Sequence, residues 1–243
     1  RFPQGKIGTS LGQLASEVDV VSRCVGNDND GRETVRAMLP HLKAGAVVLD
    51  HTTTSSALAQ EMHALCAKHA VQFLDCPVSG GQAGAENGKL TIMCGGDEAT
   101  FERVRPILAQ YSQYQRHFGA SGAGQGAKMV NQILVVNVLQ GLAEGITLGK
   151  ALGLDIEALV DTLKRGAANS WQLENRGLTM SEGKFDFGFA VDWAIKDLGI
   201  VQDCAQSLGL NMAATQEILK RYQNISANGH GREDTSALIR QFE

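Results

Sequence analysis

One long apolar segment divides the chain, and from Gly122 to Lys150 it has the sequence GAGQGAKMVNQILVVNVLQGLAEGITLGK. Its second part, residues 127–150, is apolar on most faces of a helix, which predicts a buried helix. Polar residues interrupt the apolar run at Asn131, Asn137 and Gln140. We therefore do not expect this segment to supply the roughly 20 apolar residues of a membrane span.

The residues on either side of this segment follow two different patterns. Before it, strand-like runs (20–25, 46–49, 71–74 and 90–94) alternate with helix-like runs (11–18, 33–42, 57–69 and 101–111). Such alternation predicts βαβ units and a largely parallel sheet. After it, helical spacing continues over 155–164, 190–206 and 213–222. We predict an α/β domain over residues 1–120, and a long helix with an all-α domain over 121–243.

Composition and charge exclude several classes of protein. The 243 residues have a net charge of −4 and no cluster of Lys and Arg, which argues against a nucleic-acid surface. The five cysteines form no CxxC pair, as expected for reduced thiols in the cytoplasm. The first residues are too polar for a signal peptide. The six histidines have no metal-ligand spacing, so we expect no metal.

A glycine turn follows the third predicted strand, in the stretch Asp75-Cys76-Pro77-Val78-Ser79-Gly80-Gly81. Glycines at a strand end expose backbone N–H groups, and such a nest can bind a carboxylate. The carboxyl ends of strands are also where open α/β sheets bind their ligands. A tight turn that needs glycine for its backbone geometry would use the same residues.

Lys128 enters the long helix directly after the glycine-rich approach. Asn131 and Gln132 follow three and four residues later, on the same helix face. A lysine on a buried helix is costly unless it has a partner or a task. A surface lysine whose ammonium reaches solvent is the alternative.

A Lys-Asp pair lies in a later helical stretch, Asp192-Trp193-Ala194-Ile195-Lys196-Asp197-Leu198-Gly199. By itself it would fit an ordinary exposed ion pair on a helix. Two turns, Val25-Gly26-Asn27-Asp28 and Thr52-Thr53, follow the first two predicted strands and would also fit plain turn chemistry.

Together these motifs resemble the β-hydroxyacid dehydrogenase family, of the 3-hydroxyisobutyrate dehydrogenase or tartronate semialdehyde reductase type. The resemblance implies a Rossmann-like parallel sheet, incomplete at its N-terminus, followed by an all-α domain. It implies NAD or NADP as cofactor, and hydride transfer between the nicotinamide and a small hydroxy acid or semialdehyde. The imine-reducing and sugar-phosphate members are less similar, because they replace the lysine or carry a histidine before the asparagine.

The resemblance also implies roles for individual residues. Lys128 corresponds to the catalytic acid/base, and its ordinary pKa near 10.4 would have to fall for it to act as a base near neutrality. The substrate carboxylate would be held by Ser79, Gly80 and Gly81, helped by Asn131 or Gln132. Many members carry Asn at the second of these two amide positions, so either amide is a candidate here. Val25, Gly26, Thr53 and Lys196 would lie near the cofactor.

One expected element is missing before Leu11, namely a strand, a Gly-x-Gly-x-x-Gly loop and a helix that binds the pyrophosphate. Comparison with the family pattern implies that about 40 residues with two strands are absent. Either the natural protein is longer than this sequence, or the chain is a genuine fragment whose lost strands must be replaced. We favour the first, because a truncated sheet alone should be unstable. The same segment would carry the residue that separates NAD from NADP.

A non-catalytic binding or scaffold module that kept the helical dimerisation core is the alternative to an enzyme. In either case the apolar helix surface needs cover, so we expect a homodimer or homotetramer.

Overall fold

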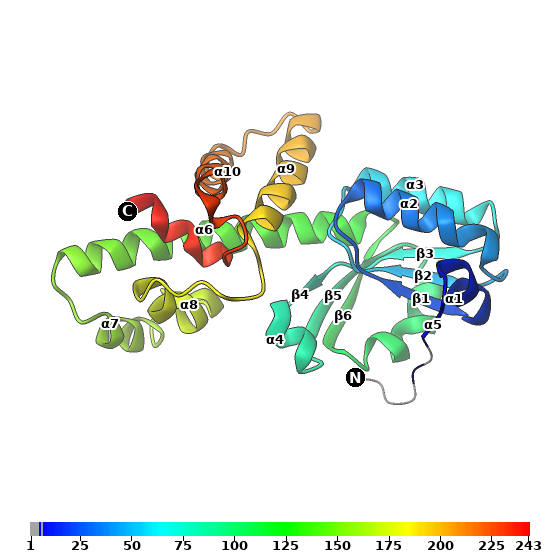
Figure 1. Cartoon of the computed structure of the whole chain (residues 1–243), viewed down its shortest axis with the longest axis horizontal. Helices are drawn as coiled ribbons and strands as arrows, with labels where there is room; N and C mark the ends of the chain where they lie inside the picture. Colours follow the sequence, from blue (N-terminus) through cyan, green and yellow to red (C-terminus); the bar gives the residue numbers. More distant parts are fainter. Residues whose placement is uncertain (1–4, 6) are drawn as a thin grey trace. The chain divides into compact units, whose positions relative to one another are not determined.

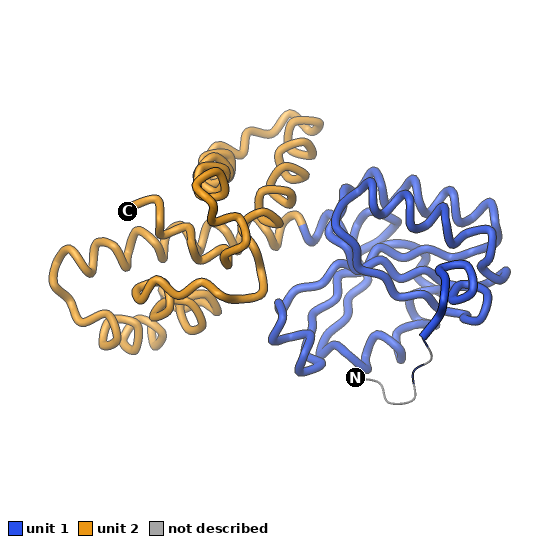
Figure 2. Tube along the Cα trace, in the orientation of Figure 1, with its two compact units in different colours: residues 1–128 blue, residues 129–243 orange. Residues whose placement is uncertain are grey.

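The computed structural model describes residue 5 and residues 7–243, which form two compact units that divide between Lys128 and Met129 (Figure 2). The division falls inside helix α6 (Ala123–Ala151), whereas the sequence suggested a boundary before the helix, at residues 120/121. Each unit has its own hydrophobic core. Residues 1–4 and 6, part of the stretch that argued against a signal peptide, lie outside the described residues.

Unit 1 is built on a six-stranded sheet (Figure 1). Its order is β1 (Val20–Arg23), β2 (Val47–Asp50), β3 (Gln72–Asp75), β5 (Leu90–Gly95) and β4 (Val78–Ser79), with β6 (Ser112–Gly119) also paired to β5. The first three strands are parallel, which confirms the predicted α/β class. Strand β5 runs antiparallel to both β3 and β4. The helix between β4 and β5, α4 (Gly81–Glu86), is too short for the crossover that a parallel pair requires.

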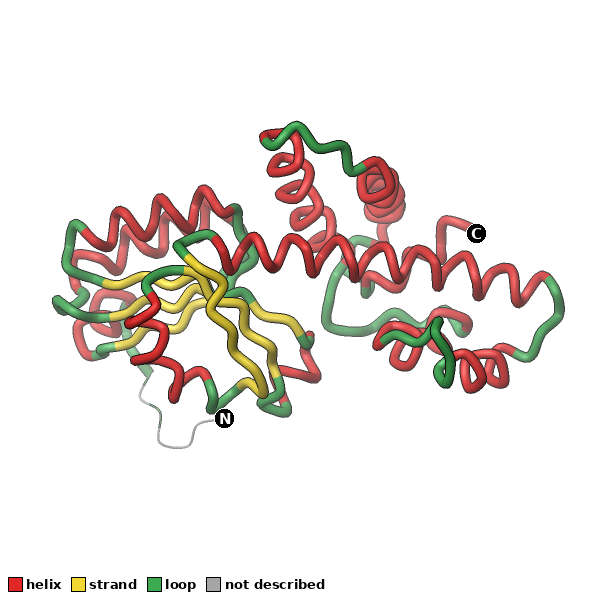
Figure 3. Tube along the Cα trace, turned by 180° about the vertical axis from the view of Figure 1, so that it is seen from behind, coloured by secondary structure: helices red, strands yellow, loops and turns green. Residues whose placement is uncertain are grey.

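Alternate residues of the central strands enter two different cores, because successive side chains of a strand point to opposite faces. Figures 1 and 3 show α2 (Asp28–Met38) and α3 (Ser56–Ala67) over one face and α5 (Glu98–Leu108) under the other. The first core includes Val21, Val35, Met38, Val48, Leu58, Met62 and Phe73. The second includes Val47, Leu49, Leu74, Ile92, Phe101, Val104 and Leu108.

Side-chain caps set the start of several helices. Asn27, Ser55, Asp97, Asp155 and Ser170 each accept a hydrogen bond from a backbone N–H two or three residues further on. The cap at Asn27 starts α2 five residues before the helix predicted over 33–42. Helix α1 (Leu11–Glu17) starts where the sequence predicted.

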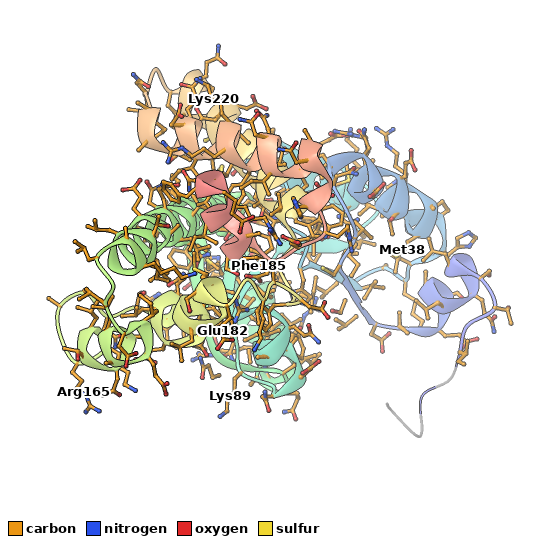
Figure 4. All side chains as sticks on the ribbon, turned by 60° about the vertical axis from the view of Figure 1, so that its left-hand side comes forward. Met38, Lys89, Arg165, Glu182, Phe185 and Lys220 are labelled. Atoms are coloured by element: carbon orange, nitrogen blue, oxygen red, sulfur yellow. The ribbon has the colours of Figure 1, made fainter. Side chains whose placement is uncertain are left out.

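Unit 2 is all-helical, as predicted. Beyond α6 it contains α7 (Ile156–Leu163), α8 (Trp171–Ser181), α9 (Val191–Ser207), α10 (Ala213–Ile225), a π-helical turn (Ser226–His230) and a 3-10 helix (Thr235–Phe242). The α6 face with Val136, Leu139, Ala143 and Ile146 packs into one core with residues of α8, α9, α10 and the 3-10 helix. In Figure 4, Arg165 and Lys220 lie at the surface of this unit and Phe185 lies among other side chains.

Helix α6 corrects the expectation about a membrane span. Among the described residues it is long and apolar enough to cross a membrane by length and composition, with a mean hydropathy of 1.3 over its best window. The polar residues that interrupt the apolar run are therefore weaker evidence against a membrane span than the sequence suggested. Core helices of globular proteins pass the same test, and one face of α6 belongs to the core of unit 2, with 33% of the apolar window buried.

Candidate active site

The start of α6 is fixed to the sheet by Asp75, the last residue of β3. Its carboxylate is fully buried and accepts hydrogen bonds from the N–H groups of Gly122 (2.8 Å) and Gln125 (3.0 Å). An anion here satisfies N–H groups that have no partner within the helix, and it complements the positive end of the helix dipole. Burial raises the pKa of Asp75, although the two backbone hydrogen bonds act in the opposite direction. Asp75 therefore anchors the helix that carries Lys128.

Two glycines, Gly95 and Gly124, allow the start of α6 to lie this close to the sheet. A Cβ on Gly95 would lie 2.7 Å from a carboxylate oxygen of Asp75. A Cβ on Gly124 would lie 2.5 Å from the Met93 carbonyl oxygen and 2.6 Å from that of Asp75. The glycine-rich approach to Lys128 thus has a packing reason, since a side chain at 124 would push α6 away from β3 and β5.

Gln125 connects α6 to the loop after β2. Its Oε1 accepts a hydrogen bond from the Thr54 N–H (3.0 Å), and its Nε2 donates one to the Thr52 carbonyl (2.8 Å). The side chain is fully buried. The carboxamide therefore holds the backbone on both sides of Thr53.

The turns after β1 and β2 are hydrogen-bonded to each other. The Val25 N–H donates to Thr52 Oγ1 (2.9 Å), and the Thr52 N–H donates to Asp50 (3.1 Å). Asp50 also forms a buried ion pair with Arg23. Val25, like Gly26 and Thr53, stays partly exposed. These turns lie at the carboxyl ends of parallel strands, where α/β sheets bind ligands.

The Ser79-Gly80-Gly81 turn has the predicted glycine geometry. Ser79 ends β4, and Gly80 and Gly81 have φ angles of +124° and +61°, in the region that favours glycine. Both glycines are exposed, so their backbone is accessible.

This turn and the first turn of α6 both lie against β5. Ser79 pairs with Thr91, two residues or about 7 Å from Met93, the residue that Gly124 contacts. Lys128 is four residues after Gly124, a helical rise of about 6 Å. Lys128 itself is buried.

In unit 2, the second amide and the Lys-Asp pair form one cluster around the buried Asp197. Gln132 Nε2 donates to Asp197 (2.6 Å), and Asn131 donates to Gln132 Oε1 (2.8 Å). Lys196 Nζ lies 3.1 Å from the other oxygen of Asp197. Asp197 is 4% exposed, which excludes an ordinary exposed ion pair. Gln132 thus joins α6 to α9, whereas Asn131 stays partly exposed.

The first turns of α2 and α3 do not suit a pyrophosphate. The side chain of Asn27 already binds two N–H groups of α2, and Asp28 and Asp30 add negative charge there. The Ser55 side chain caps α3, and Asp28 accepts hydrogen bonds from Ser55. The turns that contain Val25, Gly26 and Thr53 remain partly exposed. No cluster of three or more His, Cys, Asp or Glu suited to a metal occurs among residue 5 and residues 7–243.

Asp75, Gln125 and Asp197 belong to the candidate site, although no pattern in the sequence predicts a role for them. For Asp75, the sequence signal for a role in the site was its position at the end of an apolar strand, beside the glycine turn. Gln125 and Asp197 had no signal beyond their place within the recognised motifs.

Two family models match the chain. One, described as the NAD binding domain of 6-phosphogluconate dehydrogenase, matches residues 3–128. The other, described as NAD-binding of NADP-dependent 3-hydroxyisobutyrate dehydrogenase, matches residues 122–242. Between them they span both units.

Individual proteins are similar over nearly the whole chain. An uncharacterized oxidoreductase of Shewanella frigidimarina is 45% identical over 98% of this chain and 83% of its own length. An L-threonate dehydrogenase of Escherichia coli O6:H1 is 32% identical over 97% of this chain and 80% of its own. A solved Mycobacterium tuberculosis 3-hydroxyisobutyrate dehydrogenase with L-serine superimposes with a TM-score of 0.87 at 30% identity, covering 97% of this chain and 83% of that one.

Proposed function

Because the chain belongs to the β-hydroxyacid dehydrogenase family, we propose that it oxidises a small β-hydroxy acid, or reduces the matching semialdehyde, with Lys128 as the acid/base. The cofactor is NAD or NADP. The observation that carries the proposal is that two residues anchor the helix of Lys128. Asp75 fixes it to the carboxyl end of β3, and Gln125 fixes it to the loop after β2. Such anchoring is what an acid/base needs to keep a fixed position.

In this mechanism the substrate carboxylate binds the backbone N–H groups of the Ser79-Gly80-Gly81 turn. Lys128 Nζ hydrogen-bonds the reacting oxygen. During oxidation it accepts the hydroxyl proton, and during reduction it returns a proton to the carbonyl oxygen. Bound NAD(P)⁺ supplies the hydride acceptor. The turns at Val25-Gly26 and Thr53 hold the nicotinamide side of the cofactor.

Three residues of unit 2 enter the proposal through the family motifs. Asn131 is our choice for the substrate amide, because Gln132 is already engaged by Asp197 and is buried. Lys196, held by its ion pair with Asp197, is assigned to the cofactor.

The test uses the full-length protein and three hydroxy acids suggested by the names of the relatives: 3-hydroxyisobutyrate, L-serine and L-threonate. Formation of NADH and of NADPH is measured with each acid. We expect Lys128→Ala to lower kcat at least a hundredfold, in line with acid–base catalysis. Lys128→Arg is the control that keeps the charge but cannot lose its proton near neutral pH. A fall of less than about tenfold in Lys128→Ala would rule out the acid/base role.

A non-catalytic scaffold is the second candidate. Titration with NADH and NADPH, followed by nicotinamide fluorescence, separates the two candidates. Binding in the micromolar range would exclude the scaffold.

We further propose that the protein is cytoplasmic and at least a homodimer. The support for the homodimer is a row of exposed apolar side chains, at Val130, Leu134 and Leu148 on α6 and at Leu152 just after it, which are 58–65% exposed. Exposed apolar surface of this kind favours association. Light scattering that gave a monomeric mass at micromolar concentration would contradict it.

A further inference from the structure

Gln125 binds the loop after β2, at Thr52 and Thr54, with the kind of N–H and carbonyl hydrogen bonds that a neighbouring strand would form. Strand β2 ends at Asp50, and its own sheet pairing ends with it. Beyond that point the Gln125 carboxamide accepts from one backbone N–H, at Thr54, and donates to one carbonyl, at Thr52. All three residues are at most 2% exposed. Buried polar groups are costly without partners, so the loop conformation around Thr53 depends on this pairing.

The same residue is also held through its backbone. Asp75 accepts the Gln125 N–H, and the neighbouring bond to Gly122 fixes the preceding turn. Lys128 lies three residues after Gln125, one helical turn away on the same side of α6. A rigid first turn therefore links the Thr53 loop at one end to Lys128 at the other.

We propose that Gln125 is a positioning residue that fixes the Thr53 loop relative to Lys128 and so aligns cofactor and proton acceptor for hydride transfer. The inference rests on the proposed function. It predicts a defect in the chemical step and little change in substrate affinity, because misplacements of about 1 Å can cost a hundredfold in rate.

Two substitutions separate hydrogen bonding from shape. Gln125→Met keeps the length of the side chain and removes both hydrogen bonds. Gln125→Glu keeps the acceptor for Thr54 N–H, and only its protonated form donates to the Thr52 carbonyl. The ratio of its kcat to the wild-type kcat should therefore fall as the pH rises.

Two control variants match these changes. Gln110→Met makes the same substitution at an exposed site just after α5, where the Gln110 side chain donates to the Pro106 carbonyl. Val35→Ala destabilises the buried core of unit 1 on α2, away from the loop. Both should keep wild-type kcat, although Val35→Ala lowers the melting temperature.

The assay uses the full-length protein, saturating nicotinamide cofactor, and the hydroxy acid with the highest kcat/KM among the three named above. For Gln125→Met we expect kcat to fall at least tenfold, with KM within threefold and a larger isotope effect when the transferred hydrogen is deuterium. Amide exchange in a peptide covering residues 48–58 should become faster.

The inference is overturned if Gln125→Met keeps kcat within twofold, if amide exchange is unchanged, or if Val35→Ala lowers kcat equally. If the wild-type protein oxidises none of the three acids, the proposed function fails first and the catalytic role of Gln125 falls with it. Amide exchange would then still decide separately whether Gln125 holds the loop.

Discussion

Replacement of Gly124 by alanine tests the packing of α6 against the sheet most directly. The new Cβ would lie 2.5 Å from the Met93 carbonyl oxygen, 2.6 Å from that of Asp75 and 2.9 Å from the Asp75 carboxylate. Real Cβ atoms essentially never lie within 3.0 Å of such neighbours. Two of the three atoms belong to the backbone of paired strands, so the helix has to move instead.

The expected cost follows from two effects. Overpacking of a well-packed interior costs about 1–3 kcal/mol. Movement of the helix also stretches the hydrogen bonds that Asp75 accepts, and bonds to a charged group contribute about 1.5–3 kcal/mol each. We therefore expect Gly124→Ala to lower the free energy of unfolding by about 3 kcal/mol or more. Gly126→Ala is the matched control, because nothing lies within 4 Å of its added Cβ. It should raise the free energy of unfolding by about 0.5–1 kcal/mol.

Unfolding in guanidinium chloride measures both variants. Circular dichroism follows the whole chain, whereas fluorescence follows unit 2, because both tryptophans, Trp171 and Trp193, lie there. The loss of stability in Gly124→Ala should appear mainly in the dichroism transition, because Gly124 packs within unit 1. The reasoning is refuted if Gly124→Ala unfolds within about 0.5 kcal/mol of the wild type, or if Gly126→Ala is the more damaging change.

Three further predictions concern buried polar groups. Arg23→Met leaves the Asp50 carboxylate buried without its cation, and should cost about 3–5 kcal/mol in denaturant unfolding. Burial raises the pKa of Asp75, so the wild type loses stability as pH rises from the ordinary carboxyl range through that raised pKa. Asp75→Asn does not ionise, so its stability relative to the wild type should be greater at about pH 7 than at about pH 4. Tyr222→Phe removes the donor to the buried Thr235 carbonyl and should cost about 1–3 kcal/mol, measured by calorimetry.

Elements with strong local signals were predicted from the sequence. The apolar runs gave β1, β2, β3 and β5 to within one or two residues, and the helical spacing gave α3, α9 and α10. Strand β6 was missed because its sequence, SQYQRHFG, is polar and mostly not buried. Strand β4 was missed because it has two residues. The antiparallel direction of β5 depends on its pairing with β4, which no periodicity reveals.

The sequence could predict only those features of the site that depend on residues close together along the chain. Positive φ angles at Gly80 and Gly81 follow from the glycines themselves. The anchoring role of Asp75 depends on partners 47 and 50 residues away, and that of Gln125 on partners 71 and 73 residues away. Hydropathy and motif spacing report neighbours along the chain, so neither could pair these residues.

The glycine-rich start of α6 illustrates why a motif must be judged by what its backbone groups bind. It follows a strand, contains three glycines and begins a long helix, which are features of a phosphate-binding loop. Its N–H groups at Gly122 and Gln125 are, however, already bound to the Asp75 carboxylate. That negative charge offsets the positive end of the helix and would repel a phosphate. Gly124 is packed against β3 and β5 and leaves no room for a ligand there. Gly122 and Gly124 therefore hold the helix that carries Lys128 in place, and the phosphates of the cofactor must be bound by other groups.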